Sequence, residues 1–159
     1  MSAQLLIRLA TRADIAAMLP IINDAFAIET FLEGTRTSED QLTNMMSKGE
    51  FLLGHDSSGD LVASVYVEVR GTRGYFGMLA VAIAQQGKGF ARSMVEAAEV
   101  HCRHRGCTSM DLTVLSLCTE LPPFYSKFGY IETGTEDFRP TRPLKDGVAC
   151  HCIVMSKPL

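Results

Sequence analysis

The sequence lacks the features that mark membrane-spanning, secreted and nucleic-acid-binding proteins. No apolar run approaches the roughly 20 residues that a helix needs to cross a bilayer, and the N-terminus lacks the charged-then-apolar pattern of a signal segment. Basic residues are not in excess either, since 15 Lys and Arg face 18 Asp and Glu. Nucleic-acid-binding domains usually carry a basic surface. We therefore expect a cytoplasmic protein with neither a membrane nor a nucleic acid as partner.

The cysteine pattern fits neither a disulfide framework nor a zinc site. An odd number of cysteines without a secretory signal is typical of free thiols in a reducing compartment. The spacings of four residues in one pair and one residue in the other differ from the repeated Cys-x2–4-Cys of structural zinc sites. We expect no bound metal. The five cysteines are Cys102, Cys107, Cys118, Cys150 and Cys152.

The residues that are present predict one globular domain over residues 1–159. Hydrophobic residues make up 47% and charged residues 21%, and there is no internal repeat or linker. Hydrophobic periodicity predicts the order βααβββαβαββ, with a kink or an early break at Pro20 in the first helix. This order mixes antiparallel hairpins with one parallel crossover, which indicates an α/β (α+β) protein with a mixed sheet. The expected strands are 4–9, 50–55, 61–69, 75–81, 107–115, 129–134 and 148–155, and the expected helices begin near residues 11, 38, 90 and 120.

A glycine turn in the middle of the chain is the clearest candidate binding site. The apolar run from Met78 to Ala84 is followed by Gln85-Gln86-Gly87-Lys88-Gly89, and helical periodicity begins at Phe90. Glycines allow close approach of the backbone, and the first turn of a helix offers N–H groups without an internal partner. Strand, glycine turn and helix N-terminus together favour a phosphorylated ligand.

Two common phosphate-binding motifs do not match this turn. A Walker A loop needs Ser or Thr after its lysine, but Gly89 follows Lys88. A dinucleotide fingerprint needs a third glycine in the first βα turn, but Arg92 occupies that position and the turn lies halfway along the chain. Asp111 lies at about the right distance for a ribose-binding acid, but it is early in its expected strand.

A third pattern fits. Gln86-x-x-Gly89-x-Ala91 after an apolar strand resembles the acyl-coenzyme A loop of the GNAT superfamily of N-acetyltransferases. The segment from Pro122 to Tyr130 is similar to that family's second motif, in which a tyrosine, here Tyr125, lies four residues before Gly-aromatic. The order of expected elements is also similar to that of the family over almost the whole chain.

This resemblance implies a GNAT-like fold whose sheet is splayed between the fourth and fifth strands, with the pantetheine arm of acetyl-CoA in the gap. Backbone amides and the helix dipole would hold the pyrophosphate, and Lys88 and Arg92 would add positive charge. The implied ligand is acetyl-CoA, without a metal. The implied contacts are Met78, Leu79, Ala80, Val81, Gln86, Gly87, Lys88, Gly89, Phe90, Ala91, Arg92, Cys118 and Tyr125.

The resemblance also implies the catalytic roles. Tyr125 is expected to act as general acid toward the coenzyme A sulfur, because a phenol stays protonated at neutral pH. The backbone N–H of Leu79 is the implied oxyanion donor. The general base stays open among Glu29, Glu33, Glu68 and the weaker candidate Asp111, with Glu29 as first choice and Glu68 acting through water.

One position departs from the family pattern. Cys118 stands where the family often has an asparagine seven residues before the tyrosine. A thiol cannot reproduce the hydrogen bonds of an amide, so the contact of Cys118 with coenzyme A is in doubt. A buried small residue is the simpler interpretation of Cys118, and a covalent acetyl-cysteine route is the other.

The sequence therefore predicts an acetyl-CoA-dependent N-acetyltransferase of enzyme class 2.3.1 that acts by direct attack of a primary amine. The alternative is a catalytically inactive acyl-CoA-binding or sensing module. The sequence does not identify the amine, and it is compatible with a homodimer through the last strands.

Overall fold

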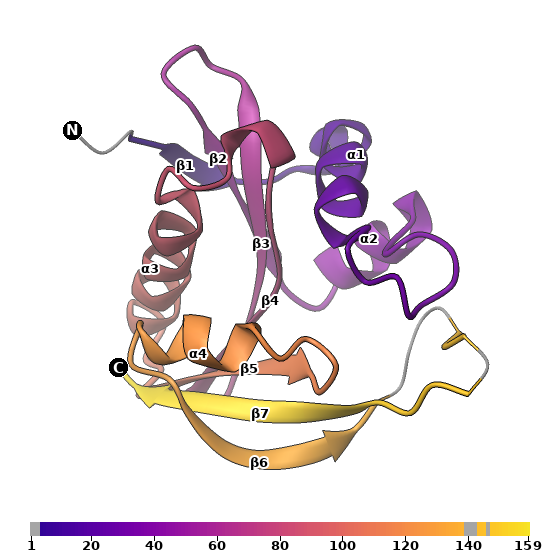
Figure 1. The fold of residues 1–159 in the computed structure, drawn as a ribbon. Coiled ribbons are helices and arrows are strands. Elements are labelled where there is room, and N and C mark those ends of the chain that lie inside the picture. The colour runs from indigo at the N-terminus through magenta and orange to yellow at the C-terminus, as the bar shows by residue number, and fades with distance from the viewer. Residues whose placement is uncertain (1–3, 139–142, 146) are drawn as a thin grey trace.

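The computed structural model describes residues 4–138, 143–145 and 147–159, and its centre is a seven-stranded mixed sheet (Figure 1). The strand order in the sheet is β1-β2-β3-β4-β5-β7-β6. The expected order of elements and the mixed sheet are confirmed. The strands are β1 (Leu6–Leu9), β2 (Glu50–His55), β3 (Leu61–Arg70), β4 (Arg73–Val81), β5 (Ser109–Leu115), β6 (Ile131–Asp137) and β7 (His151–Pro158). The helices are α1 (Ile15–Phe26), α2 (Glu39–Met46), α3 (Phe90–Arg103) and α4 (Leu121–Ser126), with short 3-10 turns η1 (Arg12–Asp14) and η2 (Ile83–Gln85).

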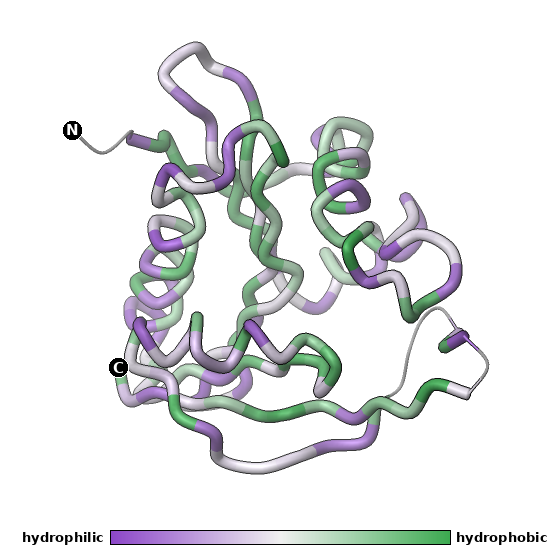
Figure 2. The backbone as a smooth tube through the Cα atoms, in the orientation of Figure 1, coloured by the Kyte–Doolittle hydropathy of each residue, from purple (hydrophilic) through white to green (hydrophobic). Residues whose placement is uncertain are grey.

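Helices cover both faces of the sheet and bury two groups of apolar side chains. On one face, Met18 and Ile22 of α1 pack with Tyr66 of β3. On the other face, Met94 of α3 packs with Val65, the neighbour of Tyr66 on β3. Neighbouring residues of a strand point to opposite faces, so β3 contributes to both cores. Figure 2 shows the hydrophobic stretches of β3 and β4 between α1 and α3. Within the described residues, no helix is long and apolar enough to cross a membrane.

The sheet opens between β4 and β5, which form the one parallel pair among the described strands. Only three residue pairs join these strands, Arg73 with Ser109 through Tyr75 with Asp111. Beyond them, β4 continues to Val81 and β5 to Leu115 without assigned pairing. The expected splay between the fourth and fifth strands is therefore confirmed.

A β-bulge lies on β4 directly beside this opening. The register with β3 passes from Tyr66–Gly77 to Ser64–Ala80, so that Met78 and Leu79 face the single residue between Ser64 and Tyr66. Met78 has φ +49, a conformation that is uncommon for a residue with a side chain. A bulge bends its strand and increases the local twist, which turns the end of β4 away from β5.

Several boundaries differ from the expectations; the sixth strand, expected over 129–134, is Ile131–Asp137. An early break at Pro20 is wrong, because α1 continues to Phe26 with fully buried Met18 and Ile22 on either side of the proline. The fifth strand begins at Ser109, because the N–H of Cys107 bonds the carbonyl of Cys102 and closes the end of α3 (3.1 Å). The last strand begins and ends three residues later than expected, because β7 pairs with β5 from Cys152 to Pro158 and with β6 at His151.

Candidate active site

Two cavities meet at the opening between β4 and β5. The larger, of about 710 Å³, lies between the turn after β4, the N-terminus of α3 and α4. The smaller, of about 410 Å³, lies between the loop after α1, β4, β5 and α4. Both volumes fall within the roughly 300–1,000 Å³ that is typical of small-molecule sites. The cavities share the residues Ala25, Leu79, Glu120, Leu121 and Tyr125.

The glycine turn forms one wall of the larger cavity. Gly87 and Gly89 have φ of +83 and +82, and Gly89 is the N-cap of α3. Because glycine has no side chain to cap the helix, the first-turn N–H groups remain available to a ligand. The side chain of Gln86 donates to the carbonyl of Val81 (3.2 Å), which ties the turn to the end of β4. Gly87, Gly89 and the residues from Phe90 to Arg92 line the cavity, and this arrangement suits a diphosphate.

The two cations of the turn have different positions. The guanidinium of Arg92 lies over the ring of Phe128 at 4.8 Å, and both residues line the larger cavity. Lys88 is exposed and donates to Oε1 of Gln85 (2.7 Å), and it is not among the lining residues. Arg92 is therefore the cation fixed at the cavity, whereas Lys88 contributes charge from the outer side of the turn.

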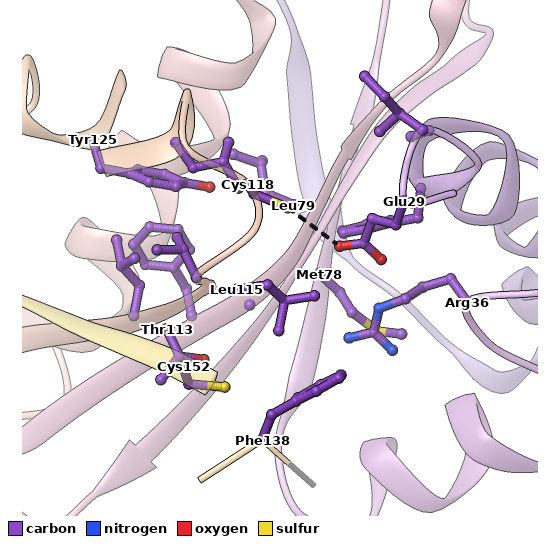
Figure 3. A pocket seen from close by; sticks show the side chains of 18 of the residues that line it. Glu29, Arg36, Met78, Leu79, Thr113, Leu115, Cys118, Tyr125, Phe138 and Cys152 are labelled. Atoms are coloured by element: carbon purple, nitrogen blue, oxygen red, sulfur yellow. Dashed lines mark hydrogen bonds between the residues drawn. The ribbon is translucent and has the colours of Figure 1, made fainter. Parts of the chain in front are cut away.

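Tyr125 occupies the junction of the two cavities. Its ring, on α4, packs edge-on against Phe76 and Phe124, with centroids 5.9 and 5.1 Å away. Burial, with Tyr75 adding a smaller effect, raises the pKa of Tyr125 above its ordinary value. Figure 3 shows the ring extending from α4 with its hydroxyl directed into the smaller cavity. Within the described chain, this hydroxyl has no protein hydrogen-bond partner, so it is available to a ligand.

Glu29 and Cys118 both line the smaller cavity, and Figure 3 shows the interaction that joins them. Glu29 is only 8% exposed, and Sγ of Cys118 donates to its Oε2 at 4.0 Å. Burial, reinforced by the negative charge of Glu29, raises the pKa of Cys118 to about 12. The thiol therefore stays protonated near neutral pH, and a protonated thiol is a weak nucleophile.

The other carboxylates considered as bases lie outside both cavities. Glu68 accepts hydrogen bonds from the hydroxyl of Tyr66 (2.8 Å) and from Nε of Arg70 (3.0 Å). Pairing with Arg70 lowers the pKa of Glu68, which makes it a poorer proton acceptor. Asp111 is held by Arg73 at the last β4–β5 residue pairs. Glu33 is exposed and is not among the lining residues.

The implied coenzyme contacts do not all line the larger cavity. Ala80 is 1% exposed and belongs to the core on the α1 face. Met78 and Cys118 line only the smaller cavity. The implied contacts that do line the larger cavity are Leu79, Val81, Gln86, Gly87, Gly89, Phe90, Ala91, Arg92 and Tyr125.

The smaller cavity contains several residues that no sequence motif pointed to. They come from loops and from strands far apart in the chain. The loop after α1 is tied to the segment before β7 by an isolated bridge between Leu32 and Leu144 and by the N–H of Glu33, which bonds the carbonyl of Pro143 (2.9 Å). The signal that the sequence did offer was that Arg36 follows Glu29 by seven residues, before the second expected helix. The additional polar or aromatic lining residues include Arg36, Gln41, Thr113, Glu120, Phe138 and Cys152.

No group of three or more His, Cys, Asp and Glu side chains that could hold a metal ion occurs in the part of the chain that the structure describes.

Comparisons with known proteins place this arrangement in a family. The model of the acetyltransferase (GNAT) domain matches residues 20–140. A search of curated proteins found no match. Many solved structures share the fold at low identity. Ribosomal-protein-alanine N-acetyltransferase from Brucella melitensis is 20% identical with a TM-score of 0.76, over 98% of this chain and 100% of the other.

Two further structures have the same fold. The GNAT superfamily phosphinothricin acetyltransferase from Sinorhizobium meliloti, solved in complex with acetyl-CoA, is 17% identical with a TM-score of 0.74, over 100% of this chain and 89% of the other. An N-acetyltransferase from Staphylococcus aureus Mu50 is 16% identical with a TM-score of 0.75, over 98% of both chains. The family model covers most of the sequence, and the chain therefore belongs to the GNAT family of N-acetyltransferases, which is in enzyme class 2.3.1.

Proposed function

We propose that residues 1–159 form a single domain that transfers the acetyl group of acetyl-CoA to a primary amine by direct attack. The observation that carries this proposal is the meeting of two cavities at Leu79 and Tyr125, where β4 and β5 part. One cavity suits the coenzyme and the other suits the amine. A thioester bound at this junction would be accessible from the coenzyme cavity and from the amine cavity.

The larger cavity has the chemistry that coenzyme A requires. The first-turn amides of α3, the helix dipole and Arg92 all favour an anion at the glycine turn. The Sinorhizobium meliloti relative was solved with acetyl-CoA, which supports the same ligand for this chain. We assign the pyrophosphate to residues 86–92 and the thioester end to Leu79 and Tyr125.

Three groups of the chain carry out the transfer in this proposal. Glu29 accepts a proton from the attacking amine, directly or through water. The N–H of Leu79 donates to the carbonyl oxygen as negative charge develops on it. Tyr125 donates its proton to sulfur as the C–N bond forms and the C–S bond breaks. Glu29 is the proposed base because it lines the smaller cavity together with Tyr125, and Glu68, which pairs with Arg70, does not line that cavity.

An acetyl-cysteine route is not supported. Two cysteines line the smaller cavity, Cys118 and Cys152, and burial raises the pKa of each thiol, which keeps both protonated near neutral pH. Direct attack needs no thiolate from the protein. Cys118 instead donates to Glu29 and helps to hold that carboxylate in place.

Two measurements separate an enzyme from an acyl-CoA-binding module. Calorimetry with acetyl-CoA reports binding, and release of free coenzyme A thiol in the presence of a panel of primary amines reports turnover. We expect binding together with amine-dependent thiol release and an N-acetyl product visible by mass spectrometry. Binding without turnover across the panel would favour the module, and absence of binding would rule out both functions.

A further inference from the structure

A buried group of polar side chains lies behind α4 and takes no part in the proposed transfer. The hydroxyl of Tyr130 donates to Oε2 of Glu99 (2.7 Å), and Nζ of Lys157 donates to both oxygens of that carboxylate (3.1 Å each). Tyr130 and Glu99 are buried. None of the three is among the described residues that line either cavity, so contact with a substrate does not account for them.

The three side chains join separate parts of the fold. Glu99 belongs to α3, Lys157 belongs to β7, and Tyr130 follows α4 directly before β6. Figure 1 shows the second half of α3 beside the end of β7. Nζ of Lys157 is 5.6 Å from the ring centroid of Tyr130, and a Cβ at Gly129 would come within 3.3 Å of its Cε. Because a buried carboxylate that loses its partners is costly, the three side chains hold one another in place.

Tyr130 connects this group to Tyr125. The two rings pack edge-on with centroids 6.3 Å apart, and both pack edge-on against Phe76 of β4, at 5.8 and 5.9 Å. The N–H of Tyr130 also bonds the carbonyl of Tyr125 (3.3 Å). α4 has only six residues, and a helix of this length is not stable by itself. Its orientation, and with it that of the Tyr125 ring, therefore depends on such tertiary contacts.

We propose that Tyr130, Glu99 and Lys157 form a positioning network that holds the ring of Tyr125 with its hydroxyl at the junction of the two cavities. This inference rests on the proposed function, in which Tyr125 is the general acid. Proton transfer to sulfur needs the hydroxyl within hydrogen-bond distance of the leaving atom. A small misplacement of a reacting group costs a large factor in rate even when the mutation lies away from the chemistry.

Tyr130→Phe tests the network with the smallest change. It keeps the ring contact with Tyr125 and removes only the hydroxyl that Glu99 holds. The matched control is Tyr66→Phe, because Tyr66 is also buried, its hydroxyl donates to Glu68 (2.8 Å), and its ring packs in the core on the α1 face. Thiol-release kinetics give kcat and KM for each variant, and thermal unfolding gives its stability.

We expect Tyr130→Phe to lower kcat by about tenfold and to leave the KM for acetyl-CoA nearly unchanged, because the acid is misplaced while the coenzyme cavity keeps its lining. Glu99→Gln should lower kcat less, since its amide oxygen can still accept from the hydroxyl of Tyr130. Tyr66→Phe should lose a similar amount of thermal stability and keep the wild-type kcat.

A double-mutant cycle distinguishes positioning of Tyr125 from a general effect on the fold. In the Tyr125→Phe background there is no hydroxyl to position, so adding Tyr130→Phe should change the residual kcat by less than about twofold. A general effect on the fold would lower kcat by the same factor in both backgrounds. The same cycle with Glu99→Gln gives this measurement independently of the stability of Tyr130→Phe.

The possible failures are distinguishable. An unchanged kcat in folded Tyr130→Phe, or an equal loss of kcat in the wild-type and Tyr125→Phe backgrounds, would overturn the positioning network and leave the transferase intact. An unchanged kcat in folded Tyr125→Phe, or binding of acetyl-CoA without acetylation of any amine, would contradict the proposed function itself, and with it this inference.

Discussion

At the scale of single residues, Tyr125 combines burial with a hydroxyl that faces the cavity. The surrounding rings of Phe76 and Phe124 exclude water and disfavour the phenolate, so the pKa of Tyr125 is raised. The proton therefore stays on the phenol until a stronger base, the departing thiolate, lies next to it. Burial therefore keeps Tyr125 in the protonated form that a general acid needs.

Tyr125→Phe should lower kcat by about a hundredfold or more and change the KM for acetyl-CoA little. Phenylalanine keeps the ring contacts and removes only the proton donor. Thiol-release kinetics at saturating amine give both constants, and thermal unfolding checks that the variant is folded. An unchanged kcat in a folded variant would remove the general-acid role.

The glycine turn allows a residue-scale test with a built-in control. Gly89, at the start of α3, and Gly59, in the β2–β3 hairpin, have φ of +82 and +84, and a Cβ at either position meets no atom within 4 Å. Replacing either one by alanine therefore imposes the same backbone strain, of about 1–2 kcal/mol. Only Gly89 lines the larger cavity.

We expect Gly89→Ala to weaken acetyl-CoA binding by about tenfold in calorimetry, because relief of the strain turns the first-turn amides of α3 away from the phosphates. Gly59→Ala should reduce thermal stability to a similar extent and leave the affinity unchanged. Equal affinities of the two variants for acetyl-CoA would show that the glycine turn does not take part in coenzyme binding.

At the scale of elements, the opening between β4 and β5 depends on the short stretch where the strands remain paired. Asp111 of β5 accepts from Nε of Arg73 of β4 (2.7 Å) and from the hydroxyl of Ser156 of β7 (2.6 Å). One carboxylate thus joins three strands at the closed end of the gap. Hydrogen bonding by Arg73, with a further contribution from Ser156, lowers the pKa of Asp111.

A lowered pKa in the folded state means that ionised Asp111 stabilises the fold at pH values above the pKa of the unfolded chain, near 4. That contribution disappears as the pH falls through the lower folded-state pKa. Asp111→Asn should therefore reduce the free energy of unfolding modestly at pH 7, since Arg73 is half exposed, and the difference from wild type should shrink in acid.

Urea unfolding followed by circular dichroism at neutral and acidic pH measures this difference. Asp24→Asn, at an exposed position on α1, is the matched control for the loss of one carboxylate. A difference in the free energy of unfolding between Asp111→Asn and wild type that persists or increases in acid would contradict the role of the ionised carboxylate.

At the scale of the whole molecule, local sequence signals located the coenzyme side of the site but not the acceptor side. Gly89 and Tyr125 were identifiable because each lies in a short motif on one element. Arg36 and Phe138 were not, because they reach the smaller cavity only after distant loops pack together. Glu29 was the first choice of base and Glu68 a further candidate, and only tertiary packing placed Glu29 in the cavity and Glu68 against Arg70.

Pairing between strands also determined the limits of the last strand, which hydrophobic periodicity did not predict. The last strand follows β5 rather than its own apolar run, so its limits moved by three residues. β6 lies at the end of the sheet, and all seven of its residues are exposed. The homodimer through the last strands and the cytoplasmic location stay predictions.

The central claim is that acetyl-CoA and the amine occupy two cavities at once and react directly where these meet. Initial rates measured while both substrates are varied test this claim most directly. The two-cavity site predicts reciprocal plots whose lines intersect, since both substrates must be bound before transfer. Parallel lines, the pattern of a covalent acetyl-enzyme, would contradict it.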